Sequence, residues 1–378
     1  MADTKPLATE LAVDEGAIAP LTTASSEGLE VRPARWTARV RRTSLASVAL
    51  LAVAFAAGVG IGPASVPAGR VVLEVVDRLP VVSLDSGLDA RQAAILWELR
   101  LPRVVLGLLV GATLSLAGGA YQGVFRNPLA DPYLLGAAAG GGFGATLVLT
   151  LGAQHGWGPF DLLPTAAFVG ALLAVGLTYT VGRAAGRGIE GTTGALILAG
   201  VAMASLFTAL QTYLQQRTDD TLREVYTWIL GGLSTSGWAE VRLILPWTAV
   251  AAAGVLLHRR PLDVLAVGDE EATTLGLPVD RTRLTVVVVA SLGTAAAVAV
   301  SGLIGFVGII VPHTVRLLVG THSYRVILPL TLVVGGAFLV LADLVARTAL
   351  SPAEVPIGVI TALVGAPFFL ALLGRRRP

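Results

Sequence analysis

The stretch that decides the fold is LRLPRVVLGLLVGATLSLAGGAYQGVFRNPLADPYLLG, residues 99–136. It begins with two arginines around a proline and continues as an apolar run of about twenty residues, the length of a bilayer crossing. The run ends in RNPLADPYLLG at 126–136, where two prolines fall among charged and polar residues. Proline stops a helix, and asparagine and aspartate hydrogen-bond the freed backbone groups of a turn. The stretch therefore predicts a membrane-spanning helix that ends in a turn at the water boundary.

Comparable apolar runs recur along the rest of the chain. Its 378 residues are 54% hydrophobic and 14% charged, with a mean hydropathy of +0.76, whereas soluble domains are about 25% charged. This composition indicates an all-α polytopic membrane protein. The runs predict about ten spans, at residues 44–62, 104–121, 134–153, 162–182, 194–214, 243–257, 284–300, 303–320, 326–346 and 356–374.

The first 43 residues differ from the rest, because they are polar and end in the basic cluster RPARWTARVRR. We interpret residues 1–43 as a disordered cytoplasmic tail and 44–378 as the transmembrane domain. A secretory signal is the alternative, but the basic region and the apolar run are both too long for one. With the N-terminus inside, roughly two thirds of the 27 lysines and arginines fall on the inner side, as the positive-inside rule requires. Both termini are therefore expected in the cytoplasm.

Glycines spaced four residues apart indicate close helix packing, since small residues let helices approach one another in lipid. Packing within one chain is the favoured interpretation, and a seam between two copies is the alternative. The glycines concerned are Gly107, Gly111, Gly136, Gly140 and Gly144.

Two segments of the chain resemble each other weakly. SLAGGAYQGVFRNPLADP at 115–132 and AVSGLIGFVGIIVPHTVR at 299–316 both place small residues before a glycine and phenylalanine, and then a proline with polar neighbours. By the span count, the two helices concerned enter the membrane from opposite sides. This arrangement is typical of the inverted-repeat halves of transporters.

The composition excludes several chemistries. The chain has no cysteine, so it has no disulfide or thiolate site, and Lys5 is its only lysine, so it has no nucleotide-binding P-loop. The four histidines lack metal-ligand spacing, and we expect neither a metal site nor an enzyme. Asp343 is the main acid within an apolar run, which disfavours an ion-coupled carrier. The net charge of +2 gives no indication of a nucleic-acid partner.

The segment RRPLDVLAVGDEEATTLGLPVDRTR, residues 259–283, joins two spans on the predicted cytoplasmic side. It predicts a short helix over about 269–275, with three acids in the first turn, where the helix dipole favours them. A glycine stops the helix at Gly276. The segment is either an amphipathic connector on the membrane or a docking knob for a soluble partner.

Four stretches together resemble the FecCD family, the BtuC-like membrane permeases of ABC importers for iron–siderophore, haem and cobalamin. They span nearly everything after residue 90, whereas the N-terminal tail departs from the family pattern. The stretches are 99–136, LAVGDEEATTLGLPV at 265–279, GLIGFVGIIVPHTVRLLVG at 302–320 and ADLVARTALSPAEVPIGVITALVGAPFFL at 342–370.

The resemblance implies the type II ABC importer permease fold, with ten helices, in the bacterial cytoplasmic (inner) membrane. It implies a homodimer with the pathway on the two-fold axis, two copies of an ABC ATPase beneath it and one extracytoplasmic substrate-binding protein. ATP and Mg would be bound by the ATPase, and this chain would hold no cofactor. An iron chelate, either a ferric siderophore or haem, is the leading substrate and cobalamin the alternative, because no residue separates them.

The resemblance also implies roles for particular residues. Arginines at the outer face would receive acids of the binding protein, although interfacial snorkelling or an ion pair between Arg347 and Asp343 would also explain them. A cytoplasmic gate is expected around the turn after the second span, but Gly194 stands where a second hydroxyl is expected. The docking arginines are Arg100, Arg103 and Arg347; the gate residues are Asn127, Leu129 and Thr193; the ATPase-coupling residues are Gly268, Asp269, Glu270, Glu271, Leu275 and Gly276.

Overall fold

The structure, a computed structural model, describes residues 33–62, 68–77, 87–152, 161–186, 192–217, 221–234 and 237–374. Each of the ten predicted spans corresponds to a helix, which confirms the all-α polytopic fold. Seven of the described helices are long and apolar enough to cross a membrane, and α5, α13 and α15 are shorter apolar helices. The ten are α1 (Pro33–Gly60), α4 (Leu101–Val124), α5 (Ala137–Thr150), α6 (Leu162–Ala185), α7 (Thr192–Gln215), α9 (Ala239–Leu257), α12 (Val279–Ser301), α13 (Val307–Val319), α14 (Tyr324–Thr348) and α15 (Ile357–Gly374).

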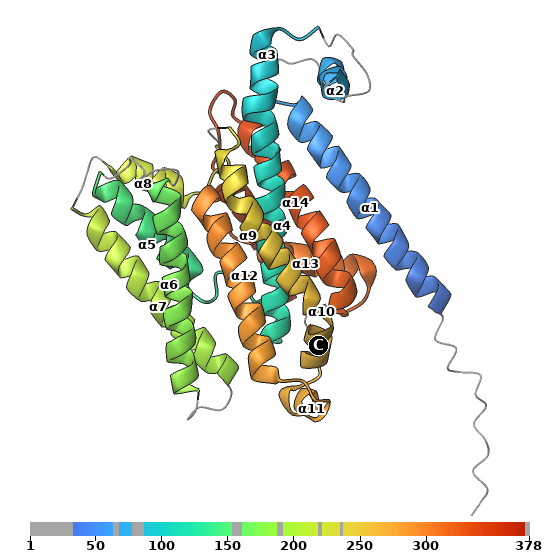
Figure 1. Ribbon diagram of the computed structural model, residues 1–378, viewed down its shortest axis with the longest axis vertical. Coiled ribbons are helices and arrows are strands. Elements are labelled where there is room, and N and C mark those ends of the chain that lie inside the picture. The colour runs from blue at the N-terminus through green and yellow to red at the C-terminus, as the bar shows by residue number, and fades with distance from the viewer. Residues whose placement is uncertain are drawn as a thin grey trace, which may run out of the picture.

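Short helices occupy the ends of the bundle (Figure 1). The end that carries α3 is called the α3 end, and the opposite end, which carries α11, is called the α11 end. The α3 helix and the π-helical stretch η2 lead directly into α4. The short elements are α2 (Ala68–Asp77), α3 (Ala90–Ala94), η2 (Ile95–Arg100), α8 (Leu222–Ile229), α10 (Arg259–Leu265) and α11 (Asp269–Thr274).

The α4 helix forms the centre of the molecule, and nearly all of its residues are buried. It packs against α9, α12, α13 and α14, and its small residues allow backbone-to-backbone contact. A Cβ on Gly111 would overlap the carbonyl oxygen of Gly335, and a Cβ on Gly118 would overlap the backbone of Gly308. The two segments that resemble each other in sequence therefore pack together.

Helices α5, α6 and α7 form a second group beside this centre (Figure 1). A Cβ on Gly140 would overlap the carbonyl oxygen of Gly170, and one on Gly144 would overlap the carbonyl oxygen of Ala166. These close approaches lie within one chain. Gly107 has a looser environment, since its Cβ would lie 3.1 Å from Leu233 Cδ1. Gly136 was wrongly grouped with the helical glycines: it precedes α5 with φ 81°, a left-handed conformation that glycine adopts readily.

The last part of the segment predicted as a disordered tail is helical. Helix α1 begins at Pro33, so residues 33–43 belong to it. Proline suits the first helical position, and the alanines and arginines that follow favour a helix. Arg39 also ties this turn to α13, because its Nε donates to the carbonyl oxygen of Leu318 at 2.8 Å. The rest of the expected tail, residues 1–32, lies outside the described residues.

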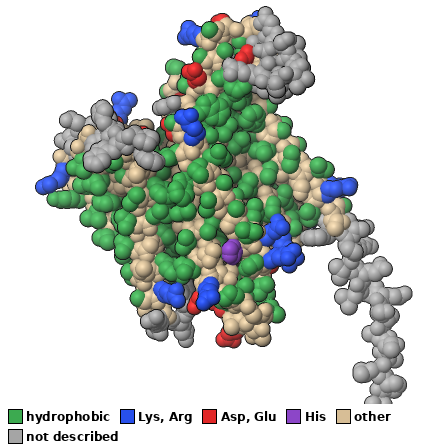
Figure 2. All heavy atoms as spheres, in the orientation of Figure 1, with side chains coloured by type: hydrophobic (Ala, Val, Ile, Leu, Met, Phe, Trp, Pro, Cys, Tyr) green, Lys and Arg blue, Asp and Glu red, His purple; other side chains and the backbone are tan. Residues whose placement is uncertain are grey.

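The surface is consistent with a membrane protein. Figure 2 shows hydrophobic side chains over the sides of the bundle, with the charged side chains gathered toward its two ends. Large apolar side chains such as Leu173 and Leu257 are well exposed. Such exposure is unfavourable in water and favourable in lipid.

Candidate functional site

The turn RNPLADPYLLG connects α4 to α5 at the α11 end of α4. Helix α4 ends at Val124, and Asn127 Oδ1 then accepts a hydrogen bond from the Leu129 N–H at 3.0 Å. Asp131 Oδ1 accepts one from the Tyr133 N–H at 2.8 Å. These bonds confirm the prediction that asparagine and aspartate satisfy freed backbone groups of the turn.

Three breaks in helical structure adjoin one another, at residues 230–234, 302–306 and 349–356. The Gly358 N–H donates to the carbonyl oxygen of Leu230 at 3.1 Å, and the Gly232 N–H donates to that of Ser301 at 2.9 Å. These bonds satisfy backbone groups that no intrahelical bond satisfies. They hold the ends of α8, α12 and α15 together.

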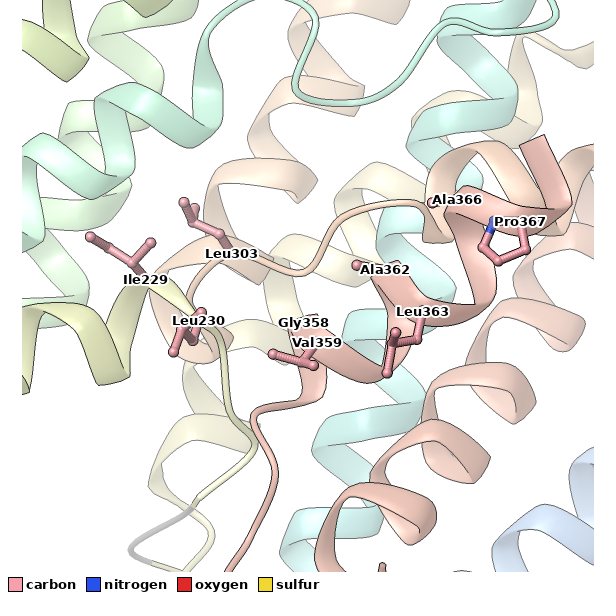
Figure 3. A pocket seen from close by; sticks show the side chains of 9 residues that line it. All are labelled: Ile229, Leu230, Leu303, Gly358, Val359, Ala362, Leu363, Ala366 and Pro367. Atoms are coloured by element: carbon pink, nitrogen blue, oxygen red, sulfur yellow. The ribbon is translucent and has the colours of Figure 1, made fainter. Parts of the chain in front are cut away.

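An open apolar groove of about 550 Å³ runs beside these breaks (Figure 3). Its walls come from α8, from the loop before α13 and from one face of α15. The lining residues are Ile229, Leu230, Leu303, Gly358, Val359, Ala362, Leu363, Ala366 and Pro367.

A second groove, of about 780 Å³, is a wide-open surface along one face of α7, and residues of α7 and its end supply all of its lining. Ser205, Thr208 and Thr212 lie three and four positions apart, so their hydroxyl groups share one face of the helix. None of the eight lining side chains carries a charge. They are Val201, Ala204, Ser205, Thr208, Ala209, Thr212, Tyr213 and Gln216. Our sequence analysis missed this stripe, although its hydroxyl spacing was visible.

The residues expected at the cytoplasmic gate are only partly described. Asn127 and Leu129 are half-buried in the turn after α4. Thr193 lies in the first turn of α7, but its side chain is outside the described residues. Their joint role as a gate stays a prediction.

At the α3 end, Arg103 joins α4 to two acids. Its Nη2 donates to Asp343 Oδ1 of α14 at 2.8 Å, and its Nη1 donates to Glu354 Oε1 at 2.8 Å. A second bond to each acid, from Nε to Asp343 Oδ1 and from Nη2 to Glu354 Oε2, completes a two-sided clamp. Charge-assisted pairs of this geometry are the strong ones.

The other two arginines of this end are buried, contrary to the expectation of exposed docking charges. Arg347 is 3% exposed and lies 3.6 Å from Asp343, as the spacing of one helical turn allows; it also donates to the carbonyl oxygen of Gly58. Arg100 is buried and donates to the carbonyl oxygen of Val59 at 3.3 Å. Both therefore tie α1 to the bundle, and Arg103 is the one of the three with a partly exposed side chain.

Our sequence analysis missed Glu354. Its side chain is 41% exposed, and its hydrogen bond to Arg103 lowers the pKa of its carboxyl group. The signal was an acid in the loop SPAEVP, close in sequence to Arg347. We name Arg103, Asp343, Arg347 and Glu354 the outer charge cluster.

At the α11 end, α10 and α11 form a knob. The expected short helix is present, with Gly268 before it and Gly276 after it. Ala272 is buried and anchors the helix, whereas Leu275 is 70% exposed. Glu270 and Glu271 are also exposed. The knob thus presents an apolar tip beside two acids, which suits a partner surface better than a lipid surface.

Asp269 is 41% exposed, but two arginines hold it. Nη2 of the buried Arg283 donates to both of its carboxylate oxygens at 3.0 Å. Arg126 Nη2, from the turn after α4, lies 3.5 Å from Asp269 Oδ1. We name these three residues the inner charge cluster. Our sequence analysis did not link them, since they are far apart in the chain.

In the part of the chain that the structure describes, ten apolar helices form a bundle with two open grooves, the architecture of a multi-pass membrane protein. The chain belongs to the FecCD transport family, whose sequence pattern matches residues 50–375. Among the described residues, no group of three or more His, Asp or Glu lies close enough to hold a metal ion.

Two relatives and one solved structure illustrate this membership. The chain is 41% identical to the cobalamin import system permease protein BtuC of Halobacterium salinarum, over 89% of each chain. It is 40% identical to the vitamin B12 import system permease protein BtuC of Klebsiella pneumoniae, over 77% of this chain and 85% of that one. An inward-facing metal-chelate type ABC transporter is 31% identical, with a TM-score of 0.74 over 88% of this chain and 98% of that one. The chain is therefore an ABC importer permease.

Proposed function

We propose that this permease moves cobalamin across the cytoplasmic membrane, driven by ATP hydrolysis in a separate subunit. The names of its relatives support cobalamin ahead of an iron chelate, since two permeases at 40% and 41% identity are named for cobalamin or vitamin B12 import. The observation that carries the proposal is the α7 groove, whose eight lining residues are uncharged and include four hydroxyls and one amide. A bulky corrinoid with amide side groups needs a wide wall that binds it weakly.

The two ends of the bundle take different sides of the membrane in this proposal. The arginine-rich α11 end faces the cytoplasm, as the positive-inside rule favours, and the α3 end faces outward. Both termini are then cytoplasmic. A second copy of the chain would face the α7 and α15 grooves across a two-fold axis, so that the pathway runs between the two copies.

Energy would enter through the knob. An ABC ATPase beneath each copy would seat α11 in a surface groove, with Leu275 as the apolar contact and Glu270 and Glu271 as its charged rim. Exposed side chains of this kind set specificity and register at an interface. Closure of the ATPase dimer on ATP would then displace α11.

The outward end would receive a substrate-binding protein. Arg103 is the arginine placed to take an acid from that partner, because it combines a charged fork with partial exposure. Glu354 already occupies part of that fork. Docking would therefore exchange one acid for another at Arg103, while the buried Arg100 and Arg347 hold α1 in place.

An iron chelate is the second candidate substrate. It is favoured by the metal-chelate type ABC transporter that shares the fold at 31% identity. Haem and many ferric siderophores carry net charge, and none of the eight residues that line the α7 groove is charged; Arg217, over the ring of Tyr213, is the one cation that the structure places beside these eight residues among those it describes. We therefore rank them below cobalamin.

An uptake assay tests the proposal. The chain, its cognate ATPase and its binding protein are reconstituted in liposomes, and uptake of cyanocobalamin, haem and a ferric siderophore is compared with and without ATP. ATP-dependent uptake of cyanocobalamin alone is expected. Uptake of haem or the siderophore instead would contradict the substrate assignment. Uptake by the chain without its ATPase would contradict the ABC mechanism.

A further inference from the structure

The inner charge cluster joins the knob to the gate turn. Asp269 opens α11, Arg283 belongs to the first turns of α12, and Arg126 directly precedes Asn127 in the turn after α4. One carboxylate therefore contacts two other elements at once.

The contact of Asp269 with Arg283 is shorter and more buried than its contact with Arg126. Arg283 is buried, and its Nη2 donates to both Asp269 oxygens at 3.0 Å, so α11 and α12 are held together. Arg126 is 42% exposed and lies 3.5 Å from Asp269, which is longer than a good charged hydrogen bond. A hollow of about 550 Å³ lies beside it. The Arg126 contact can therefore tighten or break while the Arg283 contact persists.

The backbone conformation of Arg126 indicates that its side chain has a functional role. Its φ is 49°, a left-handed conformation that Cβ-bearing residues disfavour. The Asn127 N–H donates to the carbonyl oxygen of Gln122 at 3.2 Å, which is the helix-ending bond that usually accompanies glycine at this position. An arginine thus stands where glycine would relieve the backbone. Backbone strain of this kind concentrates at functional and switching sites.

We propose that Arg126 is the positioning residue that transmits displacement of α11 to the gate turn. Movement of the knob carries Asp269, and the charge contact pulls on Arg126, whose backbone is the first residue of the turn that holds Asn127 and Leu129. This inference rests on the proposed function of α11 as the ATPase contact.

The test uses the reconstituted importer and the substrate that the wild type takes up in the assay above. Arg126→Gly removes the side chain and relieves the backbone, so it separates coupling from folding. Its substrate transported per ATP should fall about fivefold or more, the usual size of a coupling free energy, while its melting temperature stays equal or rises. Arg126→Lys keeps the charge and should retain most of the coupling. Arg183→Gln, an exposed arginine in the last turn of α6, is the matched control and should change neither quantity.

A double variant checks the partner. If Arg126 acts through Asp269, then adding Arg126→Gln to Asp269→Asn should lower the transport ratio no further than Asp269→Asn alone, because interacting residues are not additive. Additive losses would overturn the proposal. So would wild-type coupling in Arg126→Gly, or a loss of coupling accompanied by a lower melting temperature. Absence of ATP-dependent uptake by the wild type would instead contradict the proposed function, so the two failures are distinguishable.

Discussion

The outer and inner charge clusters use the same kinds of side chain in opposite ways. In the outer cluster Asp343 is 3% exposed and contacts Arg103 and Arg347, so these three charges are largely enclosed by α4 and α14, and only Glu354 lies at an exposed edge. In the inner cluster Asp269 and Arg126 are both about two-fifths exposed. The comparison indicates that burial distinguishes a charge network that braces the helices from a charge pair that forms a movable link. A buried network fixes helices, whereas an exposed pair can exchange partners.

Packing follows the same division. At the centre of the bundle the backbones of α4 and α14 are in contact, as at Gly111 and Gly335. We therefore expect these helices to move together. Helix α11 is anchored chiefly by Ala272 and Arg283, with Leu275 exposed, whereas Leu262 and Leu265 hold α10 in the core. Elements with few buried contacts open more easily. We therefore expect the two regions to respond very differently to substitution.

The largest effect is expected in the outer cluster. Asp343→Asn leaves Arg103 and Arg347 without their buried counter-charge, and the free energy of unfolding should fall by about 3–5 kcal/mol. Denaturant titration in detergent micelles measures it. The exposed Asp280→Asn at the α11 end should change stability by less than about 1 kcal/mol. Equal effects of the two variants would contradict the conclusion that the buried outer cluster braces the helices.

An intermediate effect is expected at the glycine contact. A Cβ on Gly111 would overlap the carbonyl oxygen of Gly335, so Gly111→Ala should lower the free energy of unfolding by about 1–3 kcal/mol. Gly176 of α6 has no atom within 4 Å of such a Cβ. Gly176→Ala should stabilise the helix by about 0.5–1 kcal/mol, because alanine favours helices more than glycine does. A free energy of unfolding equal to that of the wild type in Gly111→Ala would show that α4 and α14 can move apart without loss of stability.

The smallest effect is expected at the exposed edge of the outer cluster. Glu354→Gln should destabilise the protein by less than about 1 kcal/mol near neutral pH, since the side chain is 41% exposed and its pair is screened. The pKa of Glu354 is lowered in the folded protein, so its contribution is present above the unfolded value of about 4.3 and is lost as pH falls through the folded value. The difference in melting temperature between wild type and variant should therefore vanish in acid. A difference that grows on acidification would contradict this sign.

The sequence was enough to predict the ten helices and the turn after α4, because span length and proline position are local properties. The same locality explains the errors. The start of α1 at Pro33 depends on helix-forming residues that carry no apolar signal, and Gly136 shares a spacing with helical glycines although it lies outside the helix.

The site was less predictable, because its chemistry depends on contacts between distant segments. Arg100 and Arg347 lie at helix ends, but only the packing of α1 shows that they are buried. Asp269 belongs to a predicted helix, but its pairing with Arg126 and Arg283 follows from how α4, α11 and α12 meet. The roles of the gate and coupling residues remain predictions that the variants above can test.

The central claim is that energy enters this permease through α11. Its most direct test is the number of substrate molecules transported per ATP hydrolysed by the reconstituted importer carrying Glu270→Arg and Glu271→Arg together. Both side chains are exposed, so the melting temperature should not change. The account predicts that transport per ATP falls about tenfold or more. Transport per ATP equal to the wild type, in a correctly folded variant, would contradict it.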